Sequence, residues 1–251
     1  MRSLLLAAGL VFALFGSFAR SEDFRVESTV FENKEKKPTV QTSTLFYAGV
    51  VYDYMDGGTS TAVLDRTRGR FILLDAKKQE KVEIKLEETV AAVKEMGLLA
   101  SKTNNAFLKF AAEPNFEVHE IENGLEFRAS PMTYRVQCVE APAAIVSQYR
   151  EFADCTSRMN AFMHPSPPPF PRLFVNAELA SRSLMPESIE MTIPKQIALG
   201  GKGRTARSLH VLTRQLLQKD FDQIEKTASQ MAKYKLVPFA EYRKNHALAS
   251  K

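Results

Sequence analysis

Apolar and polar residues alternate along much of the chain between residues 24 and 86. Strict alternation is the pattern of a β-strand that buries one of its two faces. Polar or glycine-containing turns, such as the one at residues 56–58, separate the alternating runs. The pattern therefore predicts an antiparallel meander with short connections, whose five strands span residues 24–30, 42–54, 60–65, 70–75 and 82–86.

The apolar period then changes from two residues to about 3.6, because Leu86, Val90, Val93 and Met96 recur at helical spacing. Strand-like and helical patterns follow one another over the rest of the chain. We expect helices at residues 87–100, 104–112, 142–163 and 173–183, and strands at 116–121, 125–129, 132–140, 188–193 and 205–218. Asp220 is expected to cap a final amphipathic helix, and the polar, basic tail after Pro238 is expected to fray.

The hairpin near residue 123 needs a register, because a shift of one residue moves every side chain to the other face. A three-residue loop that ends at Gly124 places Ile121 opposite Leu125 and His119 opposite Phe127. This register makes one face of the hairpin apolar and puts the glycine in the left-handed conformation. It predicts that His119 is a hydrogen-bonded core residue.

Together, these elements indicate an α+β fold in which a curved, mostly antiparallel sheet of about eight to ten strands packs against several helices. The strongest break in the pattern is the proline-rich stretch, which favours a stiff, extended surface segment. The predicted organisation is a signal peptide (1–21), a curved antiparallel sheet with packing helices (22–164), the proline-rich segment (165–171), and a helix, strand pair and C-terminal helix that complete the same domain (172–251).

The first residues have the three parts of a secretory signal peptide. Arg2 supplies a positive charge, residues 4–15 form an apolar run, and small residues follow. The apolar run is too short for a permanent anchor. Cleavage is expected after Ser21, with Ala19 as the alternative, and the protein is then secreted or periplasmic. The remaining chain has no second long apolar run, so we expect no integral membrane segment.

Charge gives little indication of a nucleic-acid partner. The net charge of +5 comes from 34 Lys and Arg residues against 29 Asp and Glu residues. Basic and acidic side chains are mixed along the chain, which is typical of a solvated surface. We therefore expect no binding to nucleic acid.

The two cysteines matter because an exported protein meets an oxidising environment. Cys138 lies in a predicted strand, and Cys155 lies on the apolar face of the helix that follows it. A helix that folds back over this strand would bring the two thiols together. We predict a Cys138–Cys155 disulfide, and the alternative is two buried free thiols that pack as small apolar groups.

Catalytic and metal-binding motifs are missing from the sequence. The four histidines have no metal-ligand spacing, and the glycine-rich stretch 200–204 lacks the frame of a phosphate-binding loop. No nucleophile–base motif is recognisable. We therefore predict a protein that is not an enzyme and has no cofactor or metal, and an exported hydrolase is the least favoured hypothesis.

Three runs in the meander, 49–54, 62–66 and 70–78, resemble the repeated strands of the lipoprotein-carrier superfamily, the LolA/LolB-like half-barrels. The resemblance is one of strand pattern and implies a curved sheet whose concave, apolar face holds acyl chains. The predicted strand 42–54 carries apolar residues on both faces, so one face is available for a ligand. We expect the apolar pocket to be lined by Leu45, Tyr47, Tyr52, Ile72 and Leu74.

Two hypotheses for the function are therefore favoured over that of an exported hydrolase. In the first, the curved sheet binds a lipid or another apolar small molecule. In the second, the chain is an interaction or structural protein of the cell envelope, and it contacts a partner protein through the proline-rich segment and the basic tail.

Overall fold

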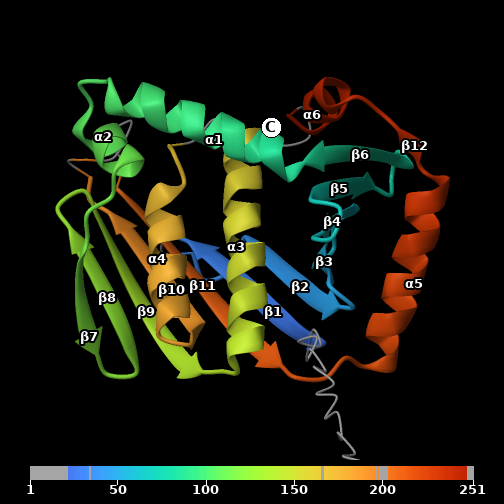
Figure 1. Cartoon of the computed structure of the whole chain (residues 1–251), viewed down its shortest axis with the longest axis horizontal. Helices are drawn as coiled ribbons and strands as arrows, with labels where there is room; N and C mark the ends of the chain where they lie inside the picture. Colours follow the sequence, from blue (N-terminus) through green and yellow to red (C-terminus); the bar gives the residue numbers. More distant parts are fainter. Residues whose placement is uncertain (1–21, 34, 165–166, 196, 198–202, 248–251) are drawn as a thin grey trace, which may run out of the picture.

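The computed structural model describes residues 22–33, 35–164, 167–195, 197 and 203–247. Within these residues, twelve strands form one curved sheet in the order β12-β6-β5-β4-β3-β2-β1-β11-β10-β9-β8-β7, and six helices pack around it (Figure 1). All neighbouring strands are antiparallel except β12 and β6. The predicted α+β class with a mostly antiparallel curved sheet is confirmed, and the sheet has more strands than predicted.

The strands are β1 (Phe24–Glu32), β2 (Val40–Tyr47), β3 (Val50–Met55), β4 (Ser60–Asp65), β5 (Arg70–Asp75), β6 (Glu80–Lys85), β7 (Glu117–Ile121), β8 (Gly124–Ala129), β9 (Met132–Glu140), β10 (Leu184–Ile193), β11 (Arg204–Thr213) and β12 (Lys235–Leu236). The helices are α1 (Leu86–Ser101), α2 (Ala106–Ala112), α3 (Ala143–Met163), α4 (Phe170–Ser181), α5 (Gln218–Lys233) and α6 (Phe239–Ala247).

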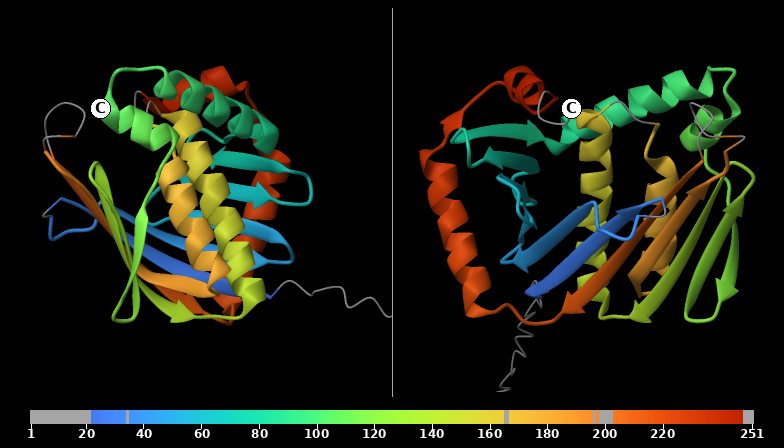
Figure 2. Two further views of the ribbon diagram at one scale, coloured as in Figure 1. Left: turned by 60° about the vertical axis from the view of Figure 1, so that its left-hand side comes forward. Right: turned by 180° about the vertical axis from the view of Figure 1, so that it is seen from behind.

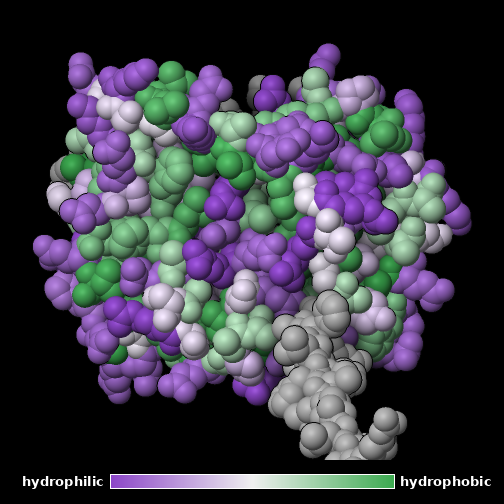
Figure 3. Space-filling model, in the orientation of Figure 1, coloured by the Kyte–Doolittle hydropathy of each residue, from purple (hydrophilic) through white to green (hydrophobic). Residues whose placement is uncertain are grey.

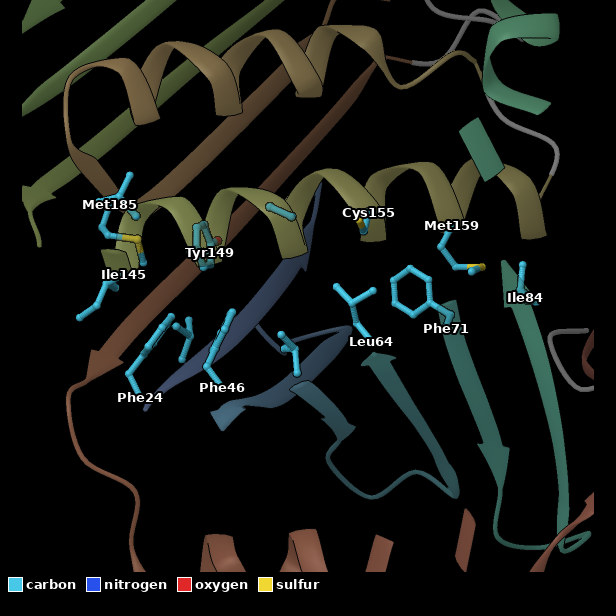
Figure 4. Close-up of a cluster of buried hydrophobic side chains, with 14 of the residues drawn as sticks. Phe24, Phe46, Leu64, Phe71, Ile84, Ile145, Tyr149, Cys155, Met159 and Met185 are labelled. Carbon is cyan, nitrogen blue, oxygen red and sulfur yellow. The ribbon is translucent and has the colours of Figure 1, made fainter. Parts of the chain in front are cut away.

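The curved sheet has an inner face, which packs against α3 and α4, and an outer face, part of which is covered by α5 (Figure 2). On the inner face, Phe24, Phe46, Leu64 and Phe71 are buried against α3. Figure 4 shows how α3 meets the strands along its length: Tyr149 lies near Phe46, Cys155 near Leu64, and Met159 near Phe71. Burial of these large side chains supplies the main hydrophobic stabilisation of this half of the sheet.

Hydrophobic and hydrophilic residues are interspersed on the face of the molecule that carries α3 and α4 (Figure 3). Helix α1 crosses the end of this layer and keeps Val90, Leu98 and Leu99 exposed. Single exposed apolar side chains are normal on protein surfaces. They do not by themselves mark a binding site.

The predicted long strand 42–54 is wrong, because the chain turns back in its middle. Ala48 and Gly49 have φ angles of 49° and 79°, and Tyr47 pairs with Val50 across this two-residue turn. Two successive positive φ angles are the geometry of a tight hairpin. Residues 42–54 therefore contribute to two neighbouring strands, β2 and β3, and this changes which side chains share a face.

The predicted register of the β7–β8 hairpin is also wrong. Ile121 pairs with Gly124, so the loop has two residues, and Val118 lies opposite Phe127. Gly124 is needed for a different reason than predicted, since a Cβ atom there would lie 1.9 Å from the carbonyl oxygen of Val136 on β9. His119 consequently points to solvent, and its imidazole lies 3.6 Å from the carboxylate of Glu117.

The region after Pro238 folds as α6 and does not fray as predicted within the described residues. Phe239 stacks on Phe162 of α3 with ring centroids 4.7 Å apart, and Tyr242 is buried. Part of the proline-rich segment also differs from the prediction, because Pro171 is a buried residue in the first turn of α4. The signal peptide predicted at residues 1–21 lies outside the described residues, as do residues 165–166, most of the glycine-rich loop and the last four residues.

The end of the predicted strand 205–218 is helical instead. Strand β11 ends at Thr213, and α5 begins at Gln218. Asp220 lies in the first turn of α5, where its carboxylate accepts a hydrogen bond from the backbone N–H of Leu217 at 2.8 Å. Asp220 therefore caps α5 from the third position of the helix. Its carboxylate accepts a backbone N–H at the helix start, where such groups have no partner within the helix.

Candidate functional site

The five residues predicted to line an apolar pocket lie together, but they form a packed core. They come from β2, β3 and β5, and their side chains lie on the outer face, where α5 covers them through Ile224 and Met231. Tyr47 lies at the edge of this cluster, with its ring centroid 5.5 Å from that of Phe221. The outer-face cluster consists of Leu45, Tyr52, Ile72 and Leu74 together with Tyr54, Val63 and Ile224.

A hollow of about 320 Å³ lies instead on the inner face, between β3–β5 and the C-terminal half of α3. We call it the inner hollow. Most of its wall is apolar. The apolar lining residues come from β3, β4, β5 and α3, and Tyr242 is contributed by α6. The apolar lining residues are Met55, Ala62, Phe71, Leu73, Met159, Met163 and Tyr242, and the polar ones are Asp53, Ser60, Thr61, Thr156, Asn160 and His164.

Small side chains on β4 explain why space remains under the helix. Ser60 and Ala62 share the inner face with Leu64 and leave room where the neighbouring strand β5 carries Phe71 and Leu73. The opposite wall is formed by Met159 and Met163, which lie one helical turn apart on α3. Methionine side chains adjust easily to the shape of a guest.

Among the described residues that line the inner hollow, Asp53 is the only aspartate or glutamate, and none is a lysine or an arginine. The hydroxyl of Thr44 donates a hydrogen bond to the Asp53 carboxylate at 2.7 Å. Burial raises the pKa of Asp53, and the hydrogen bonds from Thr44 and Thr42 oppose this rise. Within the described residues, no cationic side chain forms an ion pair with Asp53.

Thr156 contributes a second polar group to the wall of the inner hollow. Its hydroxyl oxygen is buried and has no hydrogen-bond partner among the described residues. A buried hydroxyl without a partner is unfavourable by about 1–3 kcal/mol. Such a group points to a ligand or a water molecule that completes its hydrogen bonding.

Polar residues continue from Asp53 along the inner face of β2, β1 and β11. Thr44 pairs with Asp53, Thr42 pairs with Ser28, and Ser28 pairs with His210. We call this set, together with Ser208, the inner polar band. A helix-covered sheet face normally buries apolar groups, so a row of polar residues there is informative.

His210 is held as a neutral imidazole within the inner polar band. Its Nδ1 lies 3.0 Å from the Ser28 hydroxyl and its Nε2 lies 3.0 Å from the Ser208 hydroxyl. Burial, with a smaller contribution from the nearby Arg172 guanidinium, lowers the pKa of His210 to about 3. Its ring also meets the Tyr149 ring edge-on, with centroids 6.1 Å apart.

The Ser28–His210 contact does not amount to the catalytic arrangement of a hydrolase. In such a site, one imidazole nitrogen activates the nucleophile and a carboxylate orients the other nitrogen. Here both ring nitrogens meet serine hydroxyls, and Asp53 accepts hydrogen bonds from threonines. Across the part of the chain that the structure describes, no group of three or more His, Cys, Asp or Glu residues could hold a metal ion.

Cys138 and Cys155 are both free, so the predicted disulfide is absent. The thiols lie in different apolar clusters, because β9 packs under α4 whereas Cys155 faces β4 from α3. Burial raises the pKa of each thiol to about 11. The alternative of two buried free thiols is the one that the structure contains.

Sequence reasoning missed Asp53, Thr156 and the wall formed by α3. The signal for Asp53 lies in its position two residues after Val51, because alternate residues of a strand share a face, and Val51 belongs to the cluster that packs against α3. The signal for Thr156 is weaker, since its hollow exists only after helix and sheet have packed.

No helix among the described residues is long and apolar enough to cross a membrane. No family model matches the chain, and no curated protein matches its sequence.

Proposed function

We propose that this protein binds a small amphiphile, with one apolar chain, in the inner hollow. The observation that carries the proposal is the hollow itself, which has a mostly apolar wall and a polar side at Asp53 and Thr156. Small-ligand pockets have volumes of about 300–1,000 Å³ and combine an apolar wall with a few polar groups. At about 320 Å³, the inner hollow suits a single short chain better than a lipid with two tails.

The resemblance of the meander to LolA/LolB-like half-barrels supports the same proposal. In that superfamily, the concave face of a curved sheet holds acyl chains. The inner hollow lies on the corresponding kind of face, under a helix, and Met55 at its margin is 47% exposed. An exposed, flexible apolar side chain beside a hollow favours entry of an apolar ligand.

We also propose that the protein is exported from the cytoplasm. The signal peptide expected at residues 1–21 would direct the protein to the periplasm or the extracellular medium. The alternative of an envelope protein that binds a partner through its proline-rich segment and tail receives less support. Pro171 and Tyr242, which belong to those two regions, are buried.

Native mass spectrometry of residues 22–251, purified without detergent and mixed with decanol, tests the proposal. We expect one decanol molecule to bind per chain. Ala62→Phe places a large side chain in the hollow and should weaken binding at least about tenfold. Ala76→Phe is the matched control, because Ala76 is exposed in the turn between β5 and β6.

Circular dichroism confirms that each variant is folded. Equal binding by the wild type and folded Ala62→Phe would show that the chain binds elsewhere. Absence of binding by the wild type would refute the proposal itself.

A further inference from the structure

We infer that the inner hollow selects amphiphiles whose polar end is a protonated amine, with Asp53 as its counter-ion. The inference rests on the proposed function and specifies the ligand class for the same site. The described residues of the lining include one carboxylate and neither lysine nor arginine.

Asp53 keeps acceptor capacity for a ligand. An ionised carboxylate has about four lone-pair positions. Thr44 and Thr42 donate to this carboxylate from β2, and both lie on the sheet side of the hollow. An ammonium group that enters from the hollow would meet the remaining positions.

A buried carboxylate is unfavourable unless a cation or sufficient hydrogen bonds compensate its charge. Within the described chain, the ion pairs of arginine, lysine and histidine go to other acids, and none goes to Asp53. A ligand ammonium would supply the missing positive charge. Fatty acids are disfavoured for the same reason, because their carboxylate would face Asp53 with no arginine or lysine among the described lining residues to bind it.

Thr156 and Asn160 complete a set of acceptors that suits an ammonium group. They lie four residues apart on α3, and both line the hollow that Asp53 lines. An ammonium group has three N–H donors and no acceptor. The Asp53 carboxylate and the unpartnered Thr156 hydroxyl can accept from these donors, and Asn160, which is exposed, lies at the margin of the hollow.

Three probes with the same chain and different polar ends test the inference: decylamine, decanol and decanoate. At about pH 7.5 the amine is protonated, as a lysine side chain would be. We expect calorimetric titration of the wild type to give affinities in the order decylamine, decanol, decanoate. The amine should bind at least about tenfold more tightly than the alcohol.

Asp53→Asn keeps the size of the side chain and removes its charge. This variant should lose the preference for decylamine over decanol while it still binds decanol. Asp56→Asn is the matched control, because Asp56 is exposed in the following turn and does not line the hollow. It should retain the preference of the wild type.

A second pair of variants tests the site independently if Asp53→Asn fails to fold. Thr156→Val removes the hydroxyl and should weaken decylamine binding several-fold, whereas Thr156→Ser should restore it. Equal affinities of the wild type for decylamine and decanol, or a preference that survives in folded Asp53→Asn, would overturn the inference alone. If none of the three probes binds the wild type, the proposed function fails and the inference with it.

Discussion

The guanidinium of Arg25 lies 3.4 Å from the carboxylate of Asp220, although 195 residues separate them in the sequence. Arg25 is on the outer face of β1, Asp220 is in the first turn of α5, and both are buried. The same carboxylate accepts the hydrogen bond from the Leu217 N–H. One side chain thus caps α5 and also balances a buried cation on the sheet.

Asp220→Asn should destabilise the protein by about 3 kcal/mol, because it leaves the Arg25 charge buried without its main partner. The free energy of unfolding in urea measures this change. Glu27→Gln is the matched control, since Glu27 also contacts Arg25, at 3.3 Å, but is half exposed. It should cost less than about 1 kcal/mol. Equal effects of the two substitutions would contradict a special role for the buried pair.

Gly124→Ala should cost about 2 kcal/mol or more, because the added Cβ would collide with the Val136 backbone and force β8 and β9 apart. Gly49→Ala is a useful comparison, since Gly49 has a φ of 79° but no heavy atom within 4 Å of an added Cβ. It should cost only about 1 kcal/mol, the penalty of the left-handed backbone. Urea unfolding of both variants checks the order, and a smaller effect at Gly124 would contradict the close approach of β8 to β9 at Val136.

The low pKa of His210 predicts a stability that falls in acid. Because its pKa is lowered to about 3 in the folded state, the unfolded chain binds this proton more readily below about pH 6.5. Stability from this group is therefore full above pH 6.5 and decreases toward pH 3, by at most about 1.4 kcal/mol per unit. His210→Gln should remove this part of the slope in unfolding measured between about pH 7 and 4. The control His119→Gln, at an exposed position, should leave the slope of stability against pH unchanged. Equal slopes for the wild type and His210→Gln would show that His210 does not cause the loss of stability in acid.

The ionisation of Asp53 makes stability depend on pH in the opposite direction. Its pKa is raised by burial, so the folded state holds the proton more firmly than the unfolded state does. Its contribution to stability is greatest in acid and is lost as the pH rises through the folded-state pKa. Asp53→Asn should therefore raise the thermal midpoint at neutral pH and lose this advantage in acid. A lower midpoint at neutral pH would mean that the Asp53 charge is compensated within the fold.

Both cysteines should react slowly in the native protein, because thiols with a pKa of about 11 are almost entirely protonated at neutral pH. We expect two free thiols by intact mass even after air oxidation, and fast labelling by a thiol reagent only after unfolding. A mass lower by two hydrogens would restore the predicted disulfide. Fast labelling of the native chain would contradict the burial of the thiols.

The elements with strong local signals were predictable from the sequence. Strands β4, β5 and β9 begin and end where alternation and turn residues place them. The turn at Ala48 and Gly49 was not predictable, because alanine is uncommon at a positive φ and is not a typical turn residue. In one continuous strand Leu45 and Tyr52 would lie on opposite faces, whereas the turn places them side by side under α5.

The candidate site depends on packing that local patterns do not encode. The inner hollow needs α3 to lie over β3–β5, and α6 to close one end with Tyr242. Burial of Tyr242 comes from contacts with distant residues, so a polar, basic tail gave no indication of a helix there. Asp53 shares a face with Val51 in any strand, and only the structure shows that α3 covers this face.

The place of β1 between β2 and β11 has a consequence for the order of folding. During synthesis β1 emerges first, but its partner at residues 204–213 is made about 180 residues later, as the pairing of Ser28 with His210 shows. Until then β1 can pair only with β2, and its other edge is open to pairing with another chain. Closing such a long loop is slow. A protein truncated before residue 204 should therefore aggregate through β1, and a chaperone that covers this strand would assist folding more than one that binds elsewhere.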